Sequence, residues 1–146
     1  MKKIMVITGG SRGIGAATAR LGAASGYAVC VNYRHNKTAA LAVVEEIVRG
    51  GGKAIAVAGD VGNESDVVHL FEQVDQQLGP VTALVNNAGI LETQMRVEKM
   101  DAARLGRVLA VNVIGSFLCA REAIRRMSTR QGGLGGAIVN VSSIAA

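Results

Sequence analysis

The chain has 146 residues and a formal net charge of +5, with 49% hydrophobic and 18% charged residues. This composition predicts one folded domain with a buried core and excludes a disordered segment. Residues 1–44 contain six basic and no acidic residues, so the charge excess lies in the first third. Because no Lys/Arg run accompanies that excess, we expect a small anionic ligand and neither nucleic acid nor a membrane as partner.

Two cysteines and a short N-terminal apolar run help to predict the cellular compartment of the protein. Cys30 lies in a strand-like run and Cys119 in a helical pattern. We interpret both as buried thiols and expect no disulfide and no metal site. The apolar run at residues 4–7 ends at Thr8 and is too short for a signal peptide or a membrane span. We therefore expect a cytoplasmic protein without a targeting segment.

Apolar runs of strand length alternate with segments of helical periodicity along the whole chain. In order, the sequence predicts strand 4–7, helix 13–25, strand 28–31, helix 37–49, strand 54–57, helix 63–78, strand 83–85, helix 101–130 and strand 137–141. Asn63 and Ser65 are candidate caps at the start of the third helix. Such alternation predicts an α/β fold, a doubly wound parallel sheet with helices on both faces.

A glycine-rich turn joins the first strand to the first helix, where residues 8–15 read Thr-Gly-Gly-Ser-Arg-Gly-Ile-Gly. Glycine has no Cβ, so such a turn can bring backbone N–H groups and a helix N-terminus close to a pyrophosphate. A simple connecting turn is the alternative, since G-x-G-x-x-G is not strictly matched. The cofactor contacts that we expect here are Gly9, Ser11, Arg12, Gly13, Ile14 and Gly15.

Polar motifs also follow the next three strands of the predicted sheet. Asp60 and Val61 follow the third strand, residues 86–89 (Asn-Asn-Ala-Gly) follow the fourth, and Ser142 and Ser143 end the fifth. Ligands of open α/β sheets bind at the carboxyl ends of strands. With the strand order 3-2-1-4-5, the glycine-rich turn and residues 86–89 would face one crevice.

Together these motifs resemble the short-chain dehydrogenase/reductase family, whose pattern T-G-x-x-x-G-(I/L)-G is matched at every fixed position. Within the family, the chain resembles the 3-oxoacyl-reductase-like and glucose-dehydrogenase-like members. The resemblance implies a Rossmann-like sheet of order 3-2-1-4-5, truncated here before the last strands, so that residues 1–146 form an incomplete single domain. It also implies hydride transfer between a nicotinamide cofactor and a carbonyl or alcohol substrate.

The resemblance assigns roles to particular residues. Asp60 and Val61 would hold the adenine, while Asn87, Ala88 and Gly89 would lie along the cofactor. Taken alone, Asp60 fits a turn cap equally well.

Two further residues match catalytic positions of the family. Ser143 matches the serine that steadies the carbonyl, and Asn112 the asparagine that orders a water chain. Alone, Ser143 fits a strand cap and Asn112 fits packing against a loop. The family's tyrosine follows the serine by about a dozen residues, with a lysine four further on. Neither falls within this chain, which we expect to be inactive as given.

The end of the second strand bears on the choice of cofactor. NAD-type sites have an acidic residue there for the ribose hydroxyls. Tyr33 lies at that point, Arg34 follows it, and no acid precedes Glu45. Arg34, together with Arg12, would attract a 2′-phosphate, so we predict NADP(H) over NAD(H). An arginine merely exposed to solvent is the alternative. Tyr33 also begins a Y-x-x-x-K match, which we interpret as fortuitous because it lies at the adenosine end.

Two questions stay open at this level. A non-catalytic dinucleotide-binding or sensor module is the alternative to an enzyme. The family implies a homo-oligomer, a tetramer or dimer built through the fourth helix, but the apolar residues of that helix fit core packing equally well. They are Leu105, Leu109, Val113 and Phe117.

Overall fold

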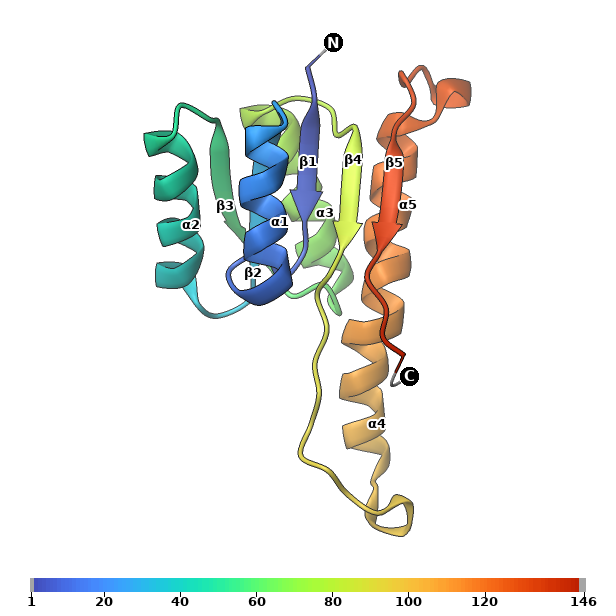
Figure 1. Cartoon of the computed structure of the whole chain (residues 1–146). Coiled ribbons are helices and arrows are strands. Elements are labelled where there is room, and N and C mark those ends of the chain that lie inside the picture. Colours follow the sequence, from blue (N-terminus) through green and yellow to red (C-terminus); the bar gives the residue numbers. More distant parts are fainter. Residues whose placement is uncertain (1, 145–146) are drawn as a thin grey trace.

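A single parallel sheet organises the chain in the computed structural model, which describes residues 2–144 (Figure 1). Its strands are β1 (Ile4–Ile7), β2 (Ala28–Tyr33), β3 (Ala54–Ala58), β4 (Ala83–Asn86) and β5 (Ala137–Asn140). They lie in the order β3-β2-β1-β4-β5, and all neighbours are parallel. The predicted fold class and strand order are therefore confirmed, with strand ends shifted by one or two residues.

Five α-helices connect and cover these strands. They are α1 (Gly13–Ala24), α2 (Lys37–Arg49), α3 (Glu64–Gln77), α4 (Ala102–Leu109) and α5 (Gly115–Met127). The predicted helix 101–130 is a composite, because the π-helical turn η2 (Ala110–Ile114) separates α4 from α5. Short 3-10 turns, η1 (Val97–Lys99) and η3 (Thr129–Gln131), were not predicted. A π turn changes helical periodicity locally, and such turns are frequent at functional sites.

The N-terminus of α3 shows one correct and one wrong prediction. The side chain of Asn63 accepts a hydrogen bond from the N–H of Asp66 at 3.2 Å and so caps the helix. Ser65 is not a cap, since its hydroxyl donates to the Asn63 side chain at 2.7 Å from within the first turn. The cap belongs to Asn63 because that residue alone has the extended backbone that precedes the helix.

Helices cover both faces of the sheet and form two hydrophobic cores. The helices α1 and α2 pack on the face that carries Val29 and Val31, whereas α3 and α5 pack on the face that carries Cys30. Alternate residues of a strand point to opposite faces, so β2 contributes to both cores. This arrangement leaves the carboxyl ends of the strands as the place for a ligand.

Both cysteines lie inside these cores, and no disulfide joins them. Burial raises the pKa of both thiols, to about 12 for Cys119, where the charge of Glu122 adds to the effect. Such thiols stay protonated and unreactive at neutral pH. The interpretation of both as buried apolar side chains is confirmed.

An ion-pair network joins α5 to α3. The Glu122 side chain is only 4% exposed and accepts hydrogen bonds from Arg125 at 2.8 Å and from Arg126 at 2.9 Å. Arg126 also pairs with Asp75 of α3 at 2.7 Å, and its guanidinium lies 5.3 Å from the centre of the Phe71 ring. The network thus links the two helices that cover one face of the sheet.

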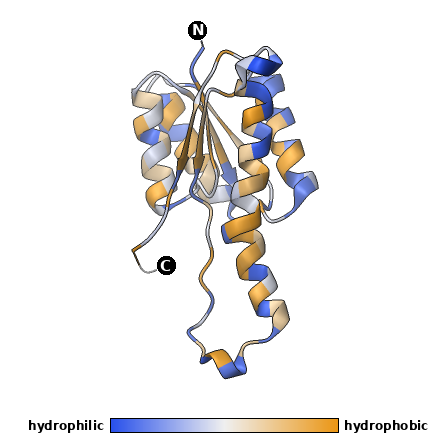
Figure 2. Ribbon diagram, turned by 90° about the vertical axis from the view of Figure 1, so that its right-hand side faces the viewer, coloured by the Kyte–Doolittle hydropathy of each residue, from blue (hydrophilic) through white to orange (hydrophobic). Residues whose placement is uncertain are grey.

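Four apolar residues, for which the sequence fits either core packing or an oligomer interface, are exposed in the structure. Leu105 is 48%, Leu109 52%, Val113 44% and Phe117 74% exposed. They lie along the long helical segment formed by α4, η2 and α5. The α4 part of this segment extends beyond the sheet, and apolar colour dominates it in Figure 2. None of the four is packed in a core of the described chain. Among the described residues, the stretch 102–127 is long and apolar enough to cross a membrane by length and composition alone, a criterion that core helices also meet.

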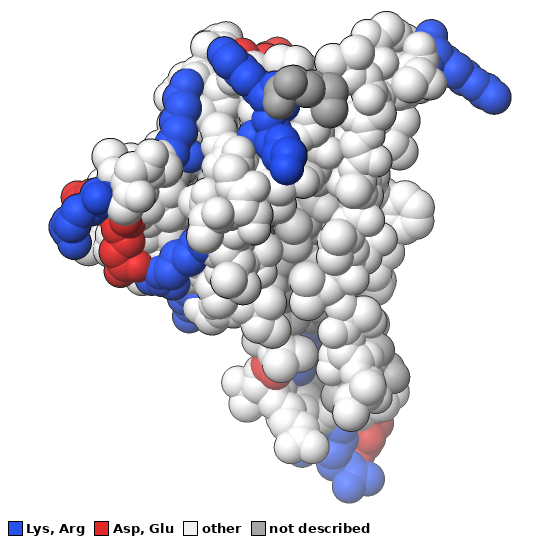
Figure 3. Space-filling model, turned by 45° about the horizontal axis from the view of Figure 1, so that its top comes forward, with Lys and Arg blue, Asp and Glu red and all other residues white. Residues whose placement is uncertain are grey.

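On the face shown in Figure 3, Lys and Arg side chains lie in separate groups, some of them beside acidic residues, and form no continuous stripe.

Candidate functional site

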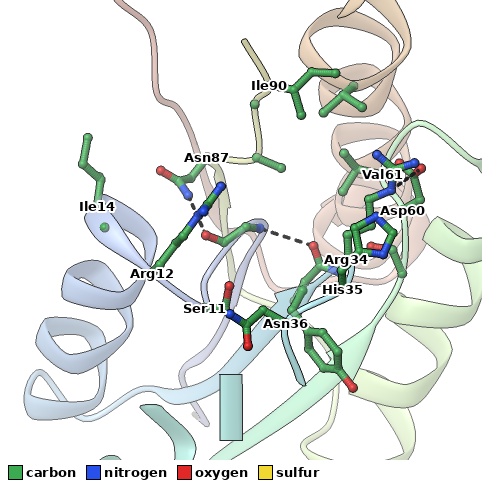
Figure 4. Close-up of a pocket in the computed structure, with 18 residues that line it drawn as sticks. Ser11, Arg12, Ile14, Arg34, His35, Asn36, Asp60, Val61, Asn87 and Ile90 are labelled. Carbon is green, nitrogen blue, oxygen red and sulfur yellow. Dashed lines mark hydrogen bonds and ion pairs between the residues drawn. The ribbon is translucent and has the colours of Figure 1, made fainter. Parts of the chain in front are cut away.

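A cavity of about 510 Å³ opens at the carboxyl ends of β1, β2 and β4 (Figure 4). Every predicted cofactor-contacting residue except Gly15 lines it. Lining residues that were not predicted are Asn32, His35, Asn36, Gly59, Ile90 and Val111. The structure thus brings together, in one crevice, the glycine-rich turn, the end of β2, Asp60–Val61 and residues 87–89.

The glycines of the turn have distinct roles. Gly9 and Gly13 have φ angles of +60° and +54°, a region that side chains disfavour. Gly15 lies behind the turn, where a Cβ would lie 2.4 Å from the Gly9 carbonyl oxygen and 2.6 Å from Nδ2 of Asn87. By contrast, a Cβ on Gly13 would meet no atom within 4 Å. Gly15 therefore permits close packing between helix and turn, and Gly13 leaves space toward the cavity.

The N-terminus of α1 is open among the described residues. Arg12 holds the cap position with extended backbone, but its side chain makes no capping hydrogen bond, and the first turn has no acidic residue. The helices α2, α3 and α4 instead use side chains of Asn36, Asn63 and Asp101. The first N–H groups of a helix carry partial positive charge and bind anions when no side chain occupies them.

Thr8 fixes the turn against the loop after β4. Its Oγ1 accepts hydrogen bonds from the N–H groups of Asn87 at 3.0 Å and Ala88 at 2.9 Å. The Asn87 amide donates in return to the carbonyl oxygens of Thr8 and Gly9, both at 3.0 Å. Thr8 is 2% exposed, so these bonds are shielded from water. The two walls of the crevice are locked together before any ligand binds.

Asn32 holds the other side of the same turn. Its Oδ1 accepts from the Gly9 N–H at 3.3 Å, and its Nδ2 donates to the carbonyl oxygens of Val57 at 3.3 Å and Gly59 at 3.0 Å. A single buried amide thus connects the ends of β1, β2 and β3. Thr8 belongs to the glycine-rich pattern, but its bonds to the loop after β4 were not predicted. Asn32 was not predicted either, although a polar residue near the end of an apolar strand is a signal for such a role.

Arg34 and Asp60 lie next to each other at the rim of the cavity. Nε of Arg34 is 3.0 Å from Oδ2 of Asp60, and the two side chains are 51% and 26% exposed. Oδ1 of Asp60 accepts from the Gly62 N–H at 2.9 Å. Arg34 is therefore paired rather than free in solvent, and Asp60 acts as the cap of its turn.

Asn112 lies in the π-helical turn and binds the loop after β4. Its Oδ1 accepts from the Ile90 N–H at 2.7 Å, and its Nδ2 donates to the Ile90 carbonyl at 2.9 Å. The Asn112 side chain thus packs against a loop, which is the alternative given for this residue in the sequence analysis. Ser143 is exposed beyond β5. Neither residue is among the described residues that line the cavity.

The Y-x-x-x-K match begins at Tyr33 at the end of β2, three strand positions away from β5, the strand that precedes Ser143. Tyr33 lines the cavity, whereas Lys37 begins α2. Adjacent strands are about 4.8 Å apart, so three strand spacings place this pair roughly 14 Å from Ser143 along the sheet edge. That separation agrees with the interpretation of the match as fortuitous.

Comparison with known proteins gives the same picture over the whole chain. The model of the short chain dehydrogenase family matches residues 3–146. The oxidoreductase YgfF of Escherichia coli is 55% identical over 97% of this chain and 58% of its own length. A 3-oxoacyl-(acyl-carrier-protein) reductase of Synechocystis is 40% identical over 98% of this chain and 56% of its own.

A solved structure agrees with the sequence comparisons. A mutant of a Serratia marcescens short-chain dehydrogenase/reductase superposes with a TM-score of 0.89 at 35% identity, over 97% of this chain and 56% of that one. The chain therefore spans less than three fifths of the length of each of these relatives. The fold, the crevice and the family model over residues 3–146 agree, and the chain belongs to the short-chain dehydrogenase family.

Proposed function

We propose that this chain is the cofactor-binding part of an oxidoreductase that uses NADP(H) to reduce a carbonyl or oxidise an alcohol. The observation that carries the proposal is the cavity, where the open N-terminus of α1 and the glycine-rich turn face the loop after β4. Residues 1–146 would form the incomplete family domain, with the proton-donating tyrosine and its lysine supplied by the rest of the protein.

The residues of the cavity fit a dinucleotide. Gly13 leaves open space where a Cβ would stand, so a pyrophosphate can approach the backbone and the first N–H groups of α1. Asp60 and Val61 at one end offer a polar and an apolar contact for the adenine. Asn87, Ala88 and Gly89 form the opposite wall, which Thr8 and Asn112 hold in place.

The bound nicotinamide would supply or accept the hydride. The chain's own residues would orient the reactants. Ser143, which follows β5, would donate a hydrogen bond to the substrate oxygen and so stabilise charge that develops there. Asn112 would keep the loop through Ile90 in position beside the nicotinamide. Because the relatives include a 3-oxoacyl reductase, ketones of that kind are the first substrates to try.

The preference for NADP(H) rests on charge at the rim of the cavity. No acidic residue ends β2, and both Arg12 and Arg34 line the cavity. An arginine forms charge-assisted and often bidentate hydrogen bonds with phosphate. We propose Arg34 as the main contact of the 2′-phosphate, with Arg12 in support.

Replacing Arg34 by alanine tests this preference. In the full-length protein, Arg34→Ala is expected to lower the ratio of NADPH affinity to NADH affinity by about 10-fold to 100-fold, the value of a hydrogen bond to a charged group. Fluorescence titration of both reduced cofactors gives the ratio. Arg49→Ala is the control, because Arg49 ends α2 and does not line the cavity. An unchanged ratio in Arg34→Ala would refute the assignment.

We also propose a homo-oligomer and a cytoplasmic location. The apolar face of Leu105, Leu109, Val113 and Phe117 is exposed, and a second copy of the chain would bury it. Two buried thiols without a disulfide suit a reducing compartment.

A further inference from the structure

The proposed phosphate-binding arginine already has an anionic partner. Figure 4 shows the Arg34 side chain directed at Asp60, and the distance from Nε to Oδ2 is 3.0 Å. Both residues line the cavity. Asp60 thus places an acidic side chain at the proposed adenosine end of the cavity. This side chain comes from the segment after β3 and not from the end of β2.

Asp60 is the fixed member of this ion pair. Its Oδ1 accepts from the Gly62 N–H, and its own N–H donates to the carboxylate of Asp66, both at 2.9 Å. Arg34 is anchored less firmly, since its side chain is 51% exposed and Asp60 is its one ion-pair partner within the described chain. A ligand that breaks this ion pair would therefore move the Arg34 side chain and leave Asp60 in place in its turn.

We propose that Asp60 competes with the 2′-phosphate for Arg34 and so limits the preference for NADP(H). The inference rests on the proposed function, in which Arg34 binds that phosphate. In the structure Asp60 approaches Nε of Arg34, an atom that a bidentate phosphate contact along the same edge of the guanidinium also requires. Cofactor binding must either break the ion pair or hold a phosphate beside a carboxylate, and both lower the affinity.

Asp60 is then a specificity-determining residue with an effect opposite to that of Arg34. Loss of its charge would leave Arg34 available to the phosphate. Its proposed adenine contact is common to both cofactors, so any loss there cancels in the ratio of their affinities. The ratio reports only on the 2′-phosphate.

The test is the variant Asp60→Asn in the full-length protein, with 2′,5′-ADP and 5′-AMP as ligands in calorimetry. Asparagine keeps an Oδ1 acceptor for the Gly62 N–H, so the turn is preserved while the charge is lost. We expect the affinity ratio of 2′,5′-ADP to 5′-AMP to rise about threefold to fivefold, the upper range for a partly exposed ion pair. Asp60→Ser, whose hydroxyl can also cap the turn, is expected to act in the same direction and serves if Asp60→Asn does not fold.

Two controls separate this inference from the proposed function. Glu64→Gln removes a nearby negative charge that pairs with Arg121 instead of Arg34, and it should leave the ratio unchanged. In an Arg34→Ala background, Asp60→Asn should raise the ratio less, because only the direct repulsion between carboxylate and phosphate is then relieved, and an equal rise in that background would overturn the competition. A ratio that falls or stays constant in Asp60→Asn overturns the competition while Arg34 keeps its role. If Arg34→Ala alone leaves the ratio unchanged, the assignment of Arg34 fails first.

Discussion

A Gly15→Ala variant of the full-length protein is expected to bind NADPH about 100-fold more weakly than the wild type, or not at all. The added Cβ would lie 2.4 Å from the Gly9 carbonyl oxygen and 2.6 Å from Nδ2 of Asn87. Ordinary contact needs about 1 Å more, so the helix and the glycine-rich turn must separate. Such a displacement moves backbone N–H groups away from the pyrophosphate, and losing hydrogen bonds to a charged group costs on the order of 10²-fold in affinity. Fluorescence titration with NADPH measures the loss.

The matched control for this variant is Gly106→Ala. Gly106 lies in α4, and a Cβ there would meet no atom within 4 Å. Alanine is the better helix former, so the control should fold at least as well as the wild type and bind NADPH equally. Wild-type affinity in Gly15→Ala would show that the turn and α1 are not closely packed around a cofactor.

The second large effect concerns stability. Glu122→Gln is expected to lower the free energy of unfolding by about 2–3 kcal/mol, because the arginines lose the nearly buried charge that holds them together. Glutamine matches glutamate in size, so the loss reports on charge rather than on a cavity. Urea unfolding of the full-length protein measures it. Glu98→Gln, which breaks an exposed pair with Arg96, should show no measurable change.

The contribution of Glu122 depends on pH in a defined direction. Burial opposes its ionisation, but the hydrogen bonds from Arg126 and Arg121 and the charge of Arg125 outweigh burial and lower the pKa of the carboxyl. A carboxyl whose pKa is lowered by folding stabilises the folded protein at pH values above the pKa of that carboxyl in the unfolded chain, which is about 4.3. The difference between wild type and Glu122→Gln should therefore be constant near neutral pH and shrink as the pH falls below about 4. A difference that grows with acidity would contradict the network.

Much of the fold followed from local patterns in the sequence. Apolar runs of strand length and helical spacing predicted every strand and long helix, since burial of one face imposes these periods. The motifs at strand ends predicted the crevice, because parallel strands bring their carboxyl ends to one edge of the sheet. Only tertiary contact could show that α4 and α5 are separated by a π turn, which Asn112 links to Ile90.

What the sequence did not reveal depends on residues far apart in the chain. The pairing of Arg34 with Asp60 arises only after β2 and β3 lie side by side, and no local pattern encodes it. The connection of three strand ends through Asn32 is of the same kind. The sequence could not decide whether Phe117 is exposed, because periodicity identifies an apolar face without showing what covers it.

The proposed function requires that this crevice bind NADPH for hydride transfer. Its most direct test is to titrate the full-length wild-type protein with NADPH and NADH and then to add a panel of ketones, with 3-oxoacyl thioesters among them. We predict tighter binding of NADPH than of NADH, and oxidation of bound NADPH once a suitable ketone is present. Binding of neither cofactor would contradict the account, and NADPH binding without oxidation by any carbonyl would favour a sensor module over an enzyme.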